Sequence, residues 1–199
     1  MPHDKATALT ETDHKFITQL KKVSESSTCL RAHVGAIAVK NGKMIGYADN
    51  SPHSCYNCSK IGCIRDIQQI PSGQRREICY GICAEQRLFA RAAKDGITLG
   101  GSTLYVTSHP CRICEGIIAE SGIVKVVYIK GFPDVIPIYD TLRDFGVEVI
   151  QARELDEHPH AAATVGNSYR IQWMRCADSQ WLDRRGTSRR GSSYRRVAS

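Results

Sequence analysis

The chain has 199 residues, a formal net charge of +7 and nine cysteines. A chain of this length can bury one sizeable core, since domains commonly hold ~100–200 residues. No run approaches the ~18 consecutive apolar residues of a membrane span, and the first residues show no apolar secretion segment. We therefore expect one cytoplasmic domain with extensions, whose thiols serve as metal ligands rather than as a disulfide framework.

The first predicted element is an amphipathic helix over residues 13–26. Apolar side chains between Phe16 and Val23 recur at the i, i+3/4, i+7 spacing of one helical face. Thr12 or Asp13 stands where an N-cap is expected. We expect the apolar face of this helix to cover one side of a sheet.

Two strands of a β-hairpin follow, over residues 34–39 and 44–47. Asn41-Gly42 lies between them and is the dipeptide most typical of a tight hairpin turn. The next segment, residues 51–82, is too long for an ordinary connection, so something must order it.

Helices and strands alternate through the rest of the predicted core. The expected elements are a helix over residues 83–94, a strand over 103–107, a helix over 111–121, a strand over 125–129, a helix over 135–145 and a strand over 147–151. Strands separated by single helices pair in parallel, whereas the opening hairpin adds an antiparallel pair. The predicted fold class is α/β, a three-layer sandwich with a mixed five-stranded sheet and helices on both faces.

Three thiols and one carboxyl stand at the spacing of a hydrolytic zinc site. Cys83-Ala84-Glu85 supplies the first thiol, and Pro110-Cys111-Arg112-Ile113-Cys114 supplies the other two. Three ligands leave the fourth position of Zn²⁺ for water, whose pKa falls from ~15.7 toward ~7. We therefore predict a catalytic zinc held by Cys83, Cys111 and Cys114.

Glu85 is predicted to be the catalytic proton carrier. It lies two residues from Cys83, so in the first turn of a helix it can face the water without binding zinc. This signature, with His or Cys as the first ligand, is typical of zinc-dependent nucleobase deaminases. The alternative is a zinc-binding module without catalysis, and the presence of Glu85 argues against it.

From roughly Asp13 to Gln151 the chain resembles the cytidine and deoxycytidylate deaminase superfamily, and most closely its deoxycytidylate branch. Besides the zinc motifs, the resemblance rests on Val34-Gly35-Ala36-Ile37, Asn50-Ser51-Pro52, Ala84-Glu85-Gln86, the segment 104–111, the segment 118–123, Phe132-Pro133-Asp134 and Gly146-Val147-Glu148-Val149. It implies hydrolytic deamination of a cytosine-type ring, with deoxycytidylate (dCMP) converted to dUMP and ammonia as the favoured reaction. It also implies a homo-oligomer and nominates Asn50 as a contact of the ribose or base. The alternative for Asn50 is a turn residue that caps local backbone.

Cys83 departs from the deoxycytidylate branch, which usually has His there, whereas free-cytidine deaminases commonly have Cys. The substrate could therefore also be a free nucleoside, a base or another aminated heterocycle. The Arg-rich segment of residues 184–199 favours a separate alternative, a deaminase that edits bases in nucleic acid. Three thiolates leave the zinc site net negative, so we expect a compensating cation nearby. Arg87 and Arg112 are the predicted candidates, and surface solvation is the alternative for each.

A second group of cysteines predicts a structural zinc. Members of the deoxycytidylate branch place a structural zinc ligand where Cys29 stands, and residues 51–82 contain a CxxC pair. The candidates are Cys29, Cys55, Cys58, Cys63 and Cys79, and our preferred set of four omits Cys58. The alternative is that these are small buried or free thiols.

The expected domain limits place the deaminase domain at residues 13–152, with the Cys-rich insertion at 51–82. An N-terminal extension covers residues 1–12, and a C-terminal extension covers 153–183. Residues 184–199 form an Arg-rich tail that is predicted to be disordered. The tail makes a nucleic-acid partner possible. A small-molecule nucleotide or nucleoside is favoured, because the core has no interleaved basic and aromatic run.

Overall fold

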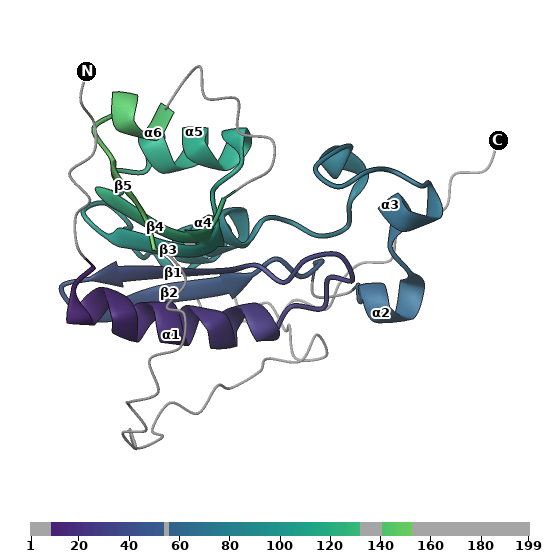
Figure 1. Ribbon diagram of the computed structural model, residues 1–199, viewed down its shortest axis with the longest axis horizontal. Coiled ribbons are helices and arrows are strands. Elements are labelled where there is room, and N and C mark those ends of the chain that lie inside the picture. Colours follow the sequence, from purple (N-terminus) through teal and green to yellow (C-terminus); the bar gives the residue numbers. More distant parts are fainter. Residues whose placement is uncertain (1–8, 54–55, 132–140, 153–199) are drawn as a thin grey trace, which may run out of the picture. The chain divides into compact units, whose positions relative to one another are not determined.

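The computed structural model describes residues 9–53, 56–131 and 141–152, which contain a five-stranded sheet and its covering helices (Figure 1). The strands are β1 (Gly35–Lys40), β2 (Lys43–Asp49), β3 (Thr103–Ser108), β4 (Lys125–Lys130) and β5 (Glu148–Gln151). The helices are α1 (Glu11–Glu25), α2 (Cys58–Ile61), α3 (Ile64–Ile67), the 3-10 helix η1 (Arg76–Ile78), α4 (Ala84–Asp95), α5 (Arg112–Glu120) and α6 (Thr141–Asp144). The extensions predicted for residues 153–183 and 184–199 lie outside the described residues.

The sheet is mixed, as predicted. Its strand order is β2-β1-β3-β4-β5, with β1 antiparallel to both β2 and β3, and with β4 parallel to both β3 and β5. The tight turn between β1 and β2 also confirms the prediction. Asn41 and Gly42 have positive φ angles of 51° and 70°, which is the conformation that an Asn-Gly hairpin turn requires.

Helix α1 begins two residues earlier than predicted. Its N-cap is Thr10, rather than Thr12 or Asp13. Asp13 N donates to Thr10 Oγ1 at 3.1 Å, and Thr10 N donates to Asp13 Oδ2 at 2.9 Å. Asp13 therefore closes a capping box from inside the first turn, which satisfies donors that would otherwise be left open at the helix start.

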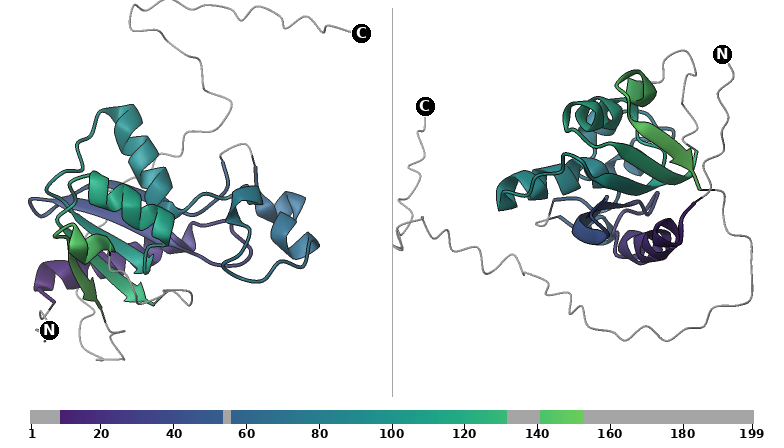
Figure 2. Two further views of the ribbon diagram at one scale, coloured as in Figure 1. Left: turned by 90° about the horizontal axis from the view of Figure 1, so that it is seen from above. Right: turned by 90° about the vertical axis from the view of Figure 1, so that its left-hand side faces the viewer.

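The two faces of the sheet carry separate apolar clusters, as alternation along the strands requires. Phe16 and Leu20 of α1 pack with Ile37 and Tyr105 on one face. Helices α4, α5 and α6 contribute to the cluster on the other face, which also contains Leu104. Figure 2 shows α1 on one side of the sheet and α4 and α5 on the other. These layers confirm the predicted three-layer α/β sandwich.

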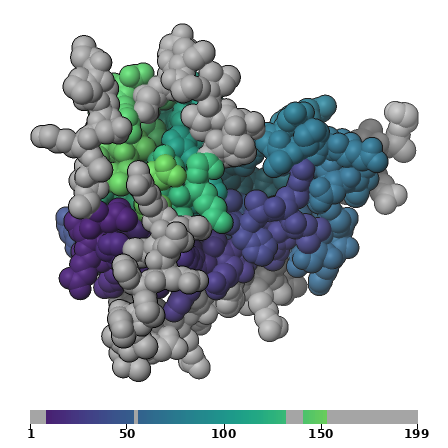
Figure 3. Space-filling view, viewed as in Figure 1, coloured from purple at the N-terminus to yellow at the C-terminus, as the bar shows by residue number. Residues whose placement is uncertain are grey.

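The insertion over residues 51–82 contains α2, α3 and η1. Figure 1 shows α2 and α3 beyond one end of the sheet, and Figure 3 shows the surface of this part of the chain in blue. An isolated antiparallel bridge between Pro52 and Gly81 brings its two ends together. Arg31 ties its middle to the core, because its Nη2 donates to the Ile70 carbonyl at 2.9 Å and its Nε lies 3.3 Å from Asp66 Oδ1. The insertion is therefore a structured part of the domain.

Every helix in the ranges that the structure describes is too short or too polar to cross a membrane.

Candidate metal centre

Two helix starts bring three cysteines together. Cys83 is the N-cap of α4, Cys111 is the N-cap of α5, and Cys114 lies in the first turn of α5. The ligand atoms of all three lie within 4.8 Å of one another, and Cys83 and Cys114 are buried. Pro110, itself fully buried, precedes the second pair. The sequence motifs thus converge in space.

The spacing of these sulfurs fits one tetrahedral zinc ion. Cys83 Sγ lies 3.9 Å from Cys111 Sγ, which lies 3.5 Å from Cys114 Sγ. Zn–S bonds of about 2.3 Å at tetrahedral angles would place ligand sulfurs about 3.8 Å apart. In the described part of the chain, this is the one group of three or more His, Cys, Asp or Glu side chains with metal-binding proximity. The three thiols can therefore hold zinc and leave its fourth position open.

The thiols influence one another strongly. The contacts with Cys114 and Cys83 lower the pKa of Cys111, and the contact with Cys111 raises the pKa of both Cys114 and Cys83. The three thiols therefore titrate as one coupled group rather than independently.

Glu85 lies in the first turn of α4 and is only 4% exposed. Burial raises the pKa of Glu85 to about 7, and the nearby Cys111 adds to this effect. The backbone N–H of Glu85 and the charge of Arg76 oppose it. A buried carboxyl with a pKa near neutrality can both accept and donate a proton, which is the property of a general acid–base group.

A basic residue that the sequence analysis did not single out lies against the cluster. Arg76, in η1 of the insertion, places Nη2 2.7 Å from Cys83 Sγ and donates a hydrogen bond to it. Burial would lower the pKa of Arg76, but the negative charges of the cysteines and Glu85 raise it. No sequence motif marks this arginine, because only the path of the insertion brings it to Cys83.

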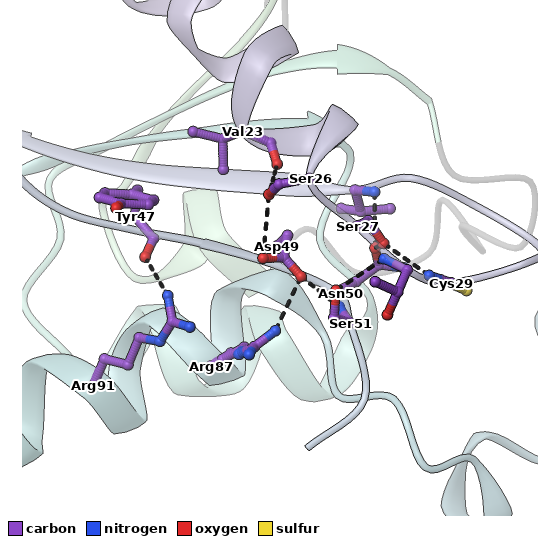
Figure 4. Close-up of polar contacts among 12 residues, drawn as sticks. Val23, Ser26, Ser27, Cys29, Tyr47, Asp49, Asn50, Ser51, Arg87 and Arg91 are labelled. Carbon is purple, nitrogen blue, oxygen red and sulfur yellow. Dashed lines mark hydrogen bonds and ion pairs between the residues drawn. The ribbon is translucent and has the colours of Figure 1, made fainter. Parts of the chain in front are cut away.

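The structure gives other partners to the two arginines predicted to compensate the thiolates. Arg87 Nη1 donates to Asp49 Oδ1 at 3.0 Å (Figure 4). Arg112 Nη1 donates at 2.8 Å to both Glu115 Oε2 and Thr141 Oγ1. The contact expected of Arg87 or Arg112, a guanidinium on a ligand sulfur, is made by Arg76. Any influence of Arg87 or Arg112 on the zinc site stays a prediction.

Asn50 follows β2 and uses its side chain to order the surrounding loops. Its Oδ1 accepts from Ser27 Oγ at 2.6 Å and from Val34 N at 3.0 Å, and its Nδ2 donates to the Ala32 carbonyl at 2.9 Å. Figure 4 shows Asn50 between the loop after α1 and the end of β2. These contacts agree with the alternative of a residue that caps local backbone. A role as a substrate contact stays a prediction.

Among the described residues, the second cysteine group does not form a cluster with the metal-binding proximity of Cys83, Cys111 and Cys114. Burial raises the pKa of Cys58, and nearby Cys29, Cys79 and Cys63 raise it further. Cys58 and Cys63 are buried, whereas Cys29 and Cys79 are half-buried. Cys55 lies outside the described residues. Cys58, which the preferred ligand set omits, is thus close enough to three other members of the candidate group for their charges to affect its pKa.

Comparison with known proteins agrees with this fold and site. A model of the cytidine and deoxycytidylate deaminase zinc-binding region matches residues 10–130. The chain is 31% identical to a deoxycytidylate deaminase of Enterobacteria phage T2, over 67% of this chain and 88% of the relative. It is 32% identical to a deoxycytidylate deaminase of Mycobacterium phage D29, over 59% of this chain and 94% of the relative.

A solved structure of a dCMP deaminase is also similar to this fold. The dCMP deaminase from cyanophage S-TIM5, in complex with dCMP and dUMP, matches with a TM-score of 0.61 and 29% identity, over 73% of this chain and 99% of that chain. A mixed sheet between helical layers, with three thiols and a buried carboxyl at two helix starts, has the features of the zinc-dependent deaminase class. The chain belongs to the cytidine and deoxycytidylate deaminase family.

Proposed function

We propose that this protein is a zinc-dependent hydrolase that converts dCMP to dUMP and releases ammonia. The observation that carries the proposal is the buried carboxyl of Glu85 beside the sulfurs of Cys83, Cys111 and Cys114. The similarity to a dCMP deaminase solved with dCMP and dUMP supports the substrate.

Each group has a separate task in this reaction. Zinc, when held by the three thiols, supplies water with a lowered pKa as the nucleophile for the ring carbon that carries the amine. The Glu85 carboxylate would take one proton from the water and donate it to the adjacent ring nitrogen. It would then take the second proton from the hydroxyl group now on the ring carbon and give it to the departing amine. Because its pKa lies at about 7, Glu85 can hold or release this proton at neutral pH. Water is consumed, the carbon–nitrogen bond breaks, and ammonia leaves.

Cys83 supports a second candidate, deamination of a free nucleoside or base or of another aminated heterocycle. Free-cytidine deaminases commonly have Cys at this position, whereas deoxycytidylate deaminases usually have His. Editing of cytosine in nucleic acid through the Arg-rich tail is a further alternative and is not favoured.

A panel of substrates separates these candidates. Ammonia release is measured with cytosine, cytidine, deoxycytidine, the monophosphates of both nucleosides and a short single-stranded DNA. We expect dCMP to give the highest kcat/KM. A higher value for cytidine or deoxycytidine would support the second candidate, and turnover of the DNA alone would support the editing candidate.

We also propose a second, structural zinc among the cysteines of the insertion and Cys29. Full-length protein should contain about two zinc ions per chain, and the catalytic ion should be the more labile because one of its positions is open. Cys63→Ser or Cys79→Ser should reduce the content to one, whereas Cys176→Ser, at the cysteine that lies outside both groups in the sequence, should leave two. Metal analysis that returns one zinc in fully active parent protein would remove the structural site.

Three further properties remain proposals. Asn50 is proposed to contact the ribose or base through the Nδ2 hydrogen that does not donate to Ala32. A homo-oligomer is proposed from the family resemblance, and a cytoplasmic location is proposed from the free thiols. An Asn50→Ala variant with raised KM for dCMP would support the contact, and light scattering of the purified chain measures the assembly state.

A further inference from the structure

We propose that Arg76 is a positioning residue that the insertion delivers to the zinc site, where it holds Cys83 and offsets the charge of the third thiolate. The proposal rests on the proposed function in one respect only, that the three thiols bind zinc.

The local backbone separates two adjacent arginines. Arg75 precedes η1 and adopts the left-handed conformation, with φ of 49° and ψ of 47°. Its side chain is 61% exposed and forms an ion pair with Glu77. Arg76, one residue later, reaches inward and donates from Nη2 to Cys83 Sγ at 2.7 Å. The turn at Arg75 thus directs one guanidinium to solvent and the next to the cluster.

The contact between Arg76 and Cys83 would offset negative charge at the zinc site. Three thiolates and one Zn²⁺ carry an excess negative charge, which disfavours ionisation of water at the metal. A guanidinium that donates to a ligand sulfur draws electron density from it and fixes its orientation. Arg87 and Arg112 are each paired with a carboxylate, Asp49 and Glu115 respectively. Their charge is therefore already partly balanced, whereas the contact of Arg76 is with a ligand.

The insertion supplies the arginine that a cysteine, rather than a histidine, at position 83 would require. Arg76 reaches Cys83 because the Pro52–Gly81 bridge closes the insertion immediately before Cys83. A neutral histidine in place of Cys83 would leave no excess charge for Arg76 to offset. We infer that Arg76 and Cys83 act as a pair, in which the arginine makes a three-cysteine site usable for hydrolysis.

The test compares Arg76→Gln and Arg76→Lys with the neighbouring control Arg75→Gln in zinc-loaded full-length protein. The first measurement is the rate of zinc transfer to a chromophoric chelator, which needs no substrate. We expect Arg76→Gln to release the catalytic zinc roughly 10-fold faster or more, since loss of a partner of a ligand weakens metal binding 10–100-fold. Arg76→Lys should fall between Gln and the parent, and Arg75→Gln should match the parent.

A second background shows whether the effect passes through the Cys83 sulfur. In Cys83→His protein, Arg76→Gln should change zinc release and kcat much less than in the parent. Co²⁺-substituted protein provides a spectroscopic measurement, because the sulfur-to-cobalt absorption band should shift in Arg76→Gln and stay unchanged in Arg75→Gln. If Arg76→Gln does not fold, zinc release and cobalt absorption of Arg76→Lys are compared with those of the parent and of Arg75→Gln instead.

Parental zinc release and an unshifted cobalt band in folded Arg76→Gln would overturn the proposal. An equal effect of Arg76→Gln in the parent and in the Cys83→His background would do the same. Failure of the parent to deaminate any member of the substrate panel would instead contradict the proposed function, and would leave the zinc-release comparison valid.

Discussion

At the start of α4, the candidate zinc ligand Cys83 and the candidate proton carrier Glu85 lie two residues apart. Cys83 directs its sulfur toward Cys111, 3.9 Å away, while Glu85 is buried with 4% exposure. A carboxyl in these surroundings favours its protonated form more than one in water does, so it exchanges a proton near neutral pH. In the proposed reaction, the helix start would therefore place a metal ligand and a proton carrier side by side without merging their roles.

The first prediction concerns Glu85. Glu85→Ala should reduce kcat for the deaminated substrate by roughly 10²–10⁴-fold or more, because the reaction loses its proton carrier. Zinc content should stay at the parental level, since Glu85 is not a ligand. The control is Glu120→Ala, an exposed glutamate at the end of α5 that should leave turnover unchanged. A kcat within a few-fold of the parent in zinc-loaded Glu85→Ala would contradict the assigned role.

Helix α1 is fixed to the sheet by a buried carboxylate. Asp13 is 2% exposed, accepts from Tyr105 Oη at 2.6 Å, and lies 3.3 Å from Lys125 Nζ. Burial by itself would raise the pKa of Asp13. The hydrogen bonds from Tyr105 and Thr10 and the charge of Lys125 outweigh it and lower the pKa to about 2.

The second prediction follows from this shift. The pKa of Asp13 is lower in the folded protein than in the unfolded chain, so its stabilisation is present above about pH 4 and is lost as the pH falls toward about 2. The shift corresponds to about 2 kcal/mol. Asp13→Asn should therefore unfold at lower denaturant concentration at pH 7, and the difference should shrink in acid. Glu11→Gln, at an exposed site in the same turn, is the control, and equal stability of Asp13→Asn and parent at pH 7 would refute the argument.

The third prediction compares a glycine that is in close contact with its neighbours and a glycine that has open space beside it. A Cβ added at Gly35 in β1 would lie 2.9 Å from Ser24 N and 3.1 Å from the Leu20 carbonyl, so α1 and β1 would have to separate. Gly35→Ala should lower the free energy of unfolding by about 1–3 kcal/mol. Gly116→Ala in α5 meets no atom within 4 Å and should raise stability by about 0.5–1 kcal/mol. Denaturant unfolding of both variants is the measurement. Unchanged stability of Gly35→Ala would show that α1 and β1 do not approach closely at Gly35.

In the whole molecule, the insertion and the core contribute different parts of one site. Helices α4 and α5 supply the thiols and Glu85, whereas η1 of the insertion supplies Arg76. Asp49 at the end of β2 accepts from Arg87 of α4 and from Ser51 N at 2.8 Å, which connects α4 to the beginning of the insertion. Order in the insertion is therefore a condition for the contact at Cys83.

The fourth prediction concerns the other end of the chain. Removal of residues 184–199 should leave kcat/KM for the small substrate unchanged, because the family match covers residues 10–130 and every candidate site residue lies before this segment. Steady-state assays of the full-length and shortened chains provide the comparison. A large loss of turnover after trimming would instead make the tail part of the site or of a subunit contact.

Much of the fold can be predicted because its signals are local. The hairpin follows from Asn41-Gly42, and the alternation of strands and helices after residue 83 implies the parallel pairs that the sheet contains. The start of α1 is predicted less well. Thr10, Thr12 and Asp13 all suit an N-cap, and only the contacts of Asp13 with Tyr105 and Lys125 show that it belongs inside the first turn.

The candidate zinc ligands and proton carrier can be read from the chain alone, because Cys83, Glu85 and the Cys111–Cys114 pair occupy set positions at two helix starts. The arginine that meets a ligand sulfur cannot be read in this way and depends on the tertiary fold. A long side chain can reach partners in many directions, so closeness in sequence suggests Arg87 and Arg112. The fold instead pairs those two with carboxylates and returns the insertion so that Arg76 contacts Cys83.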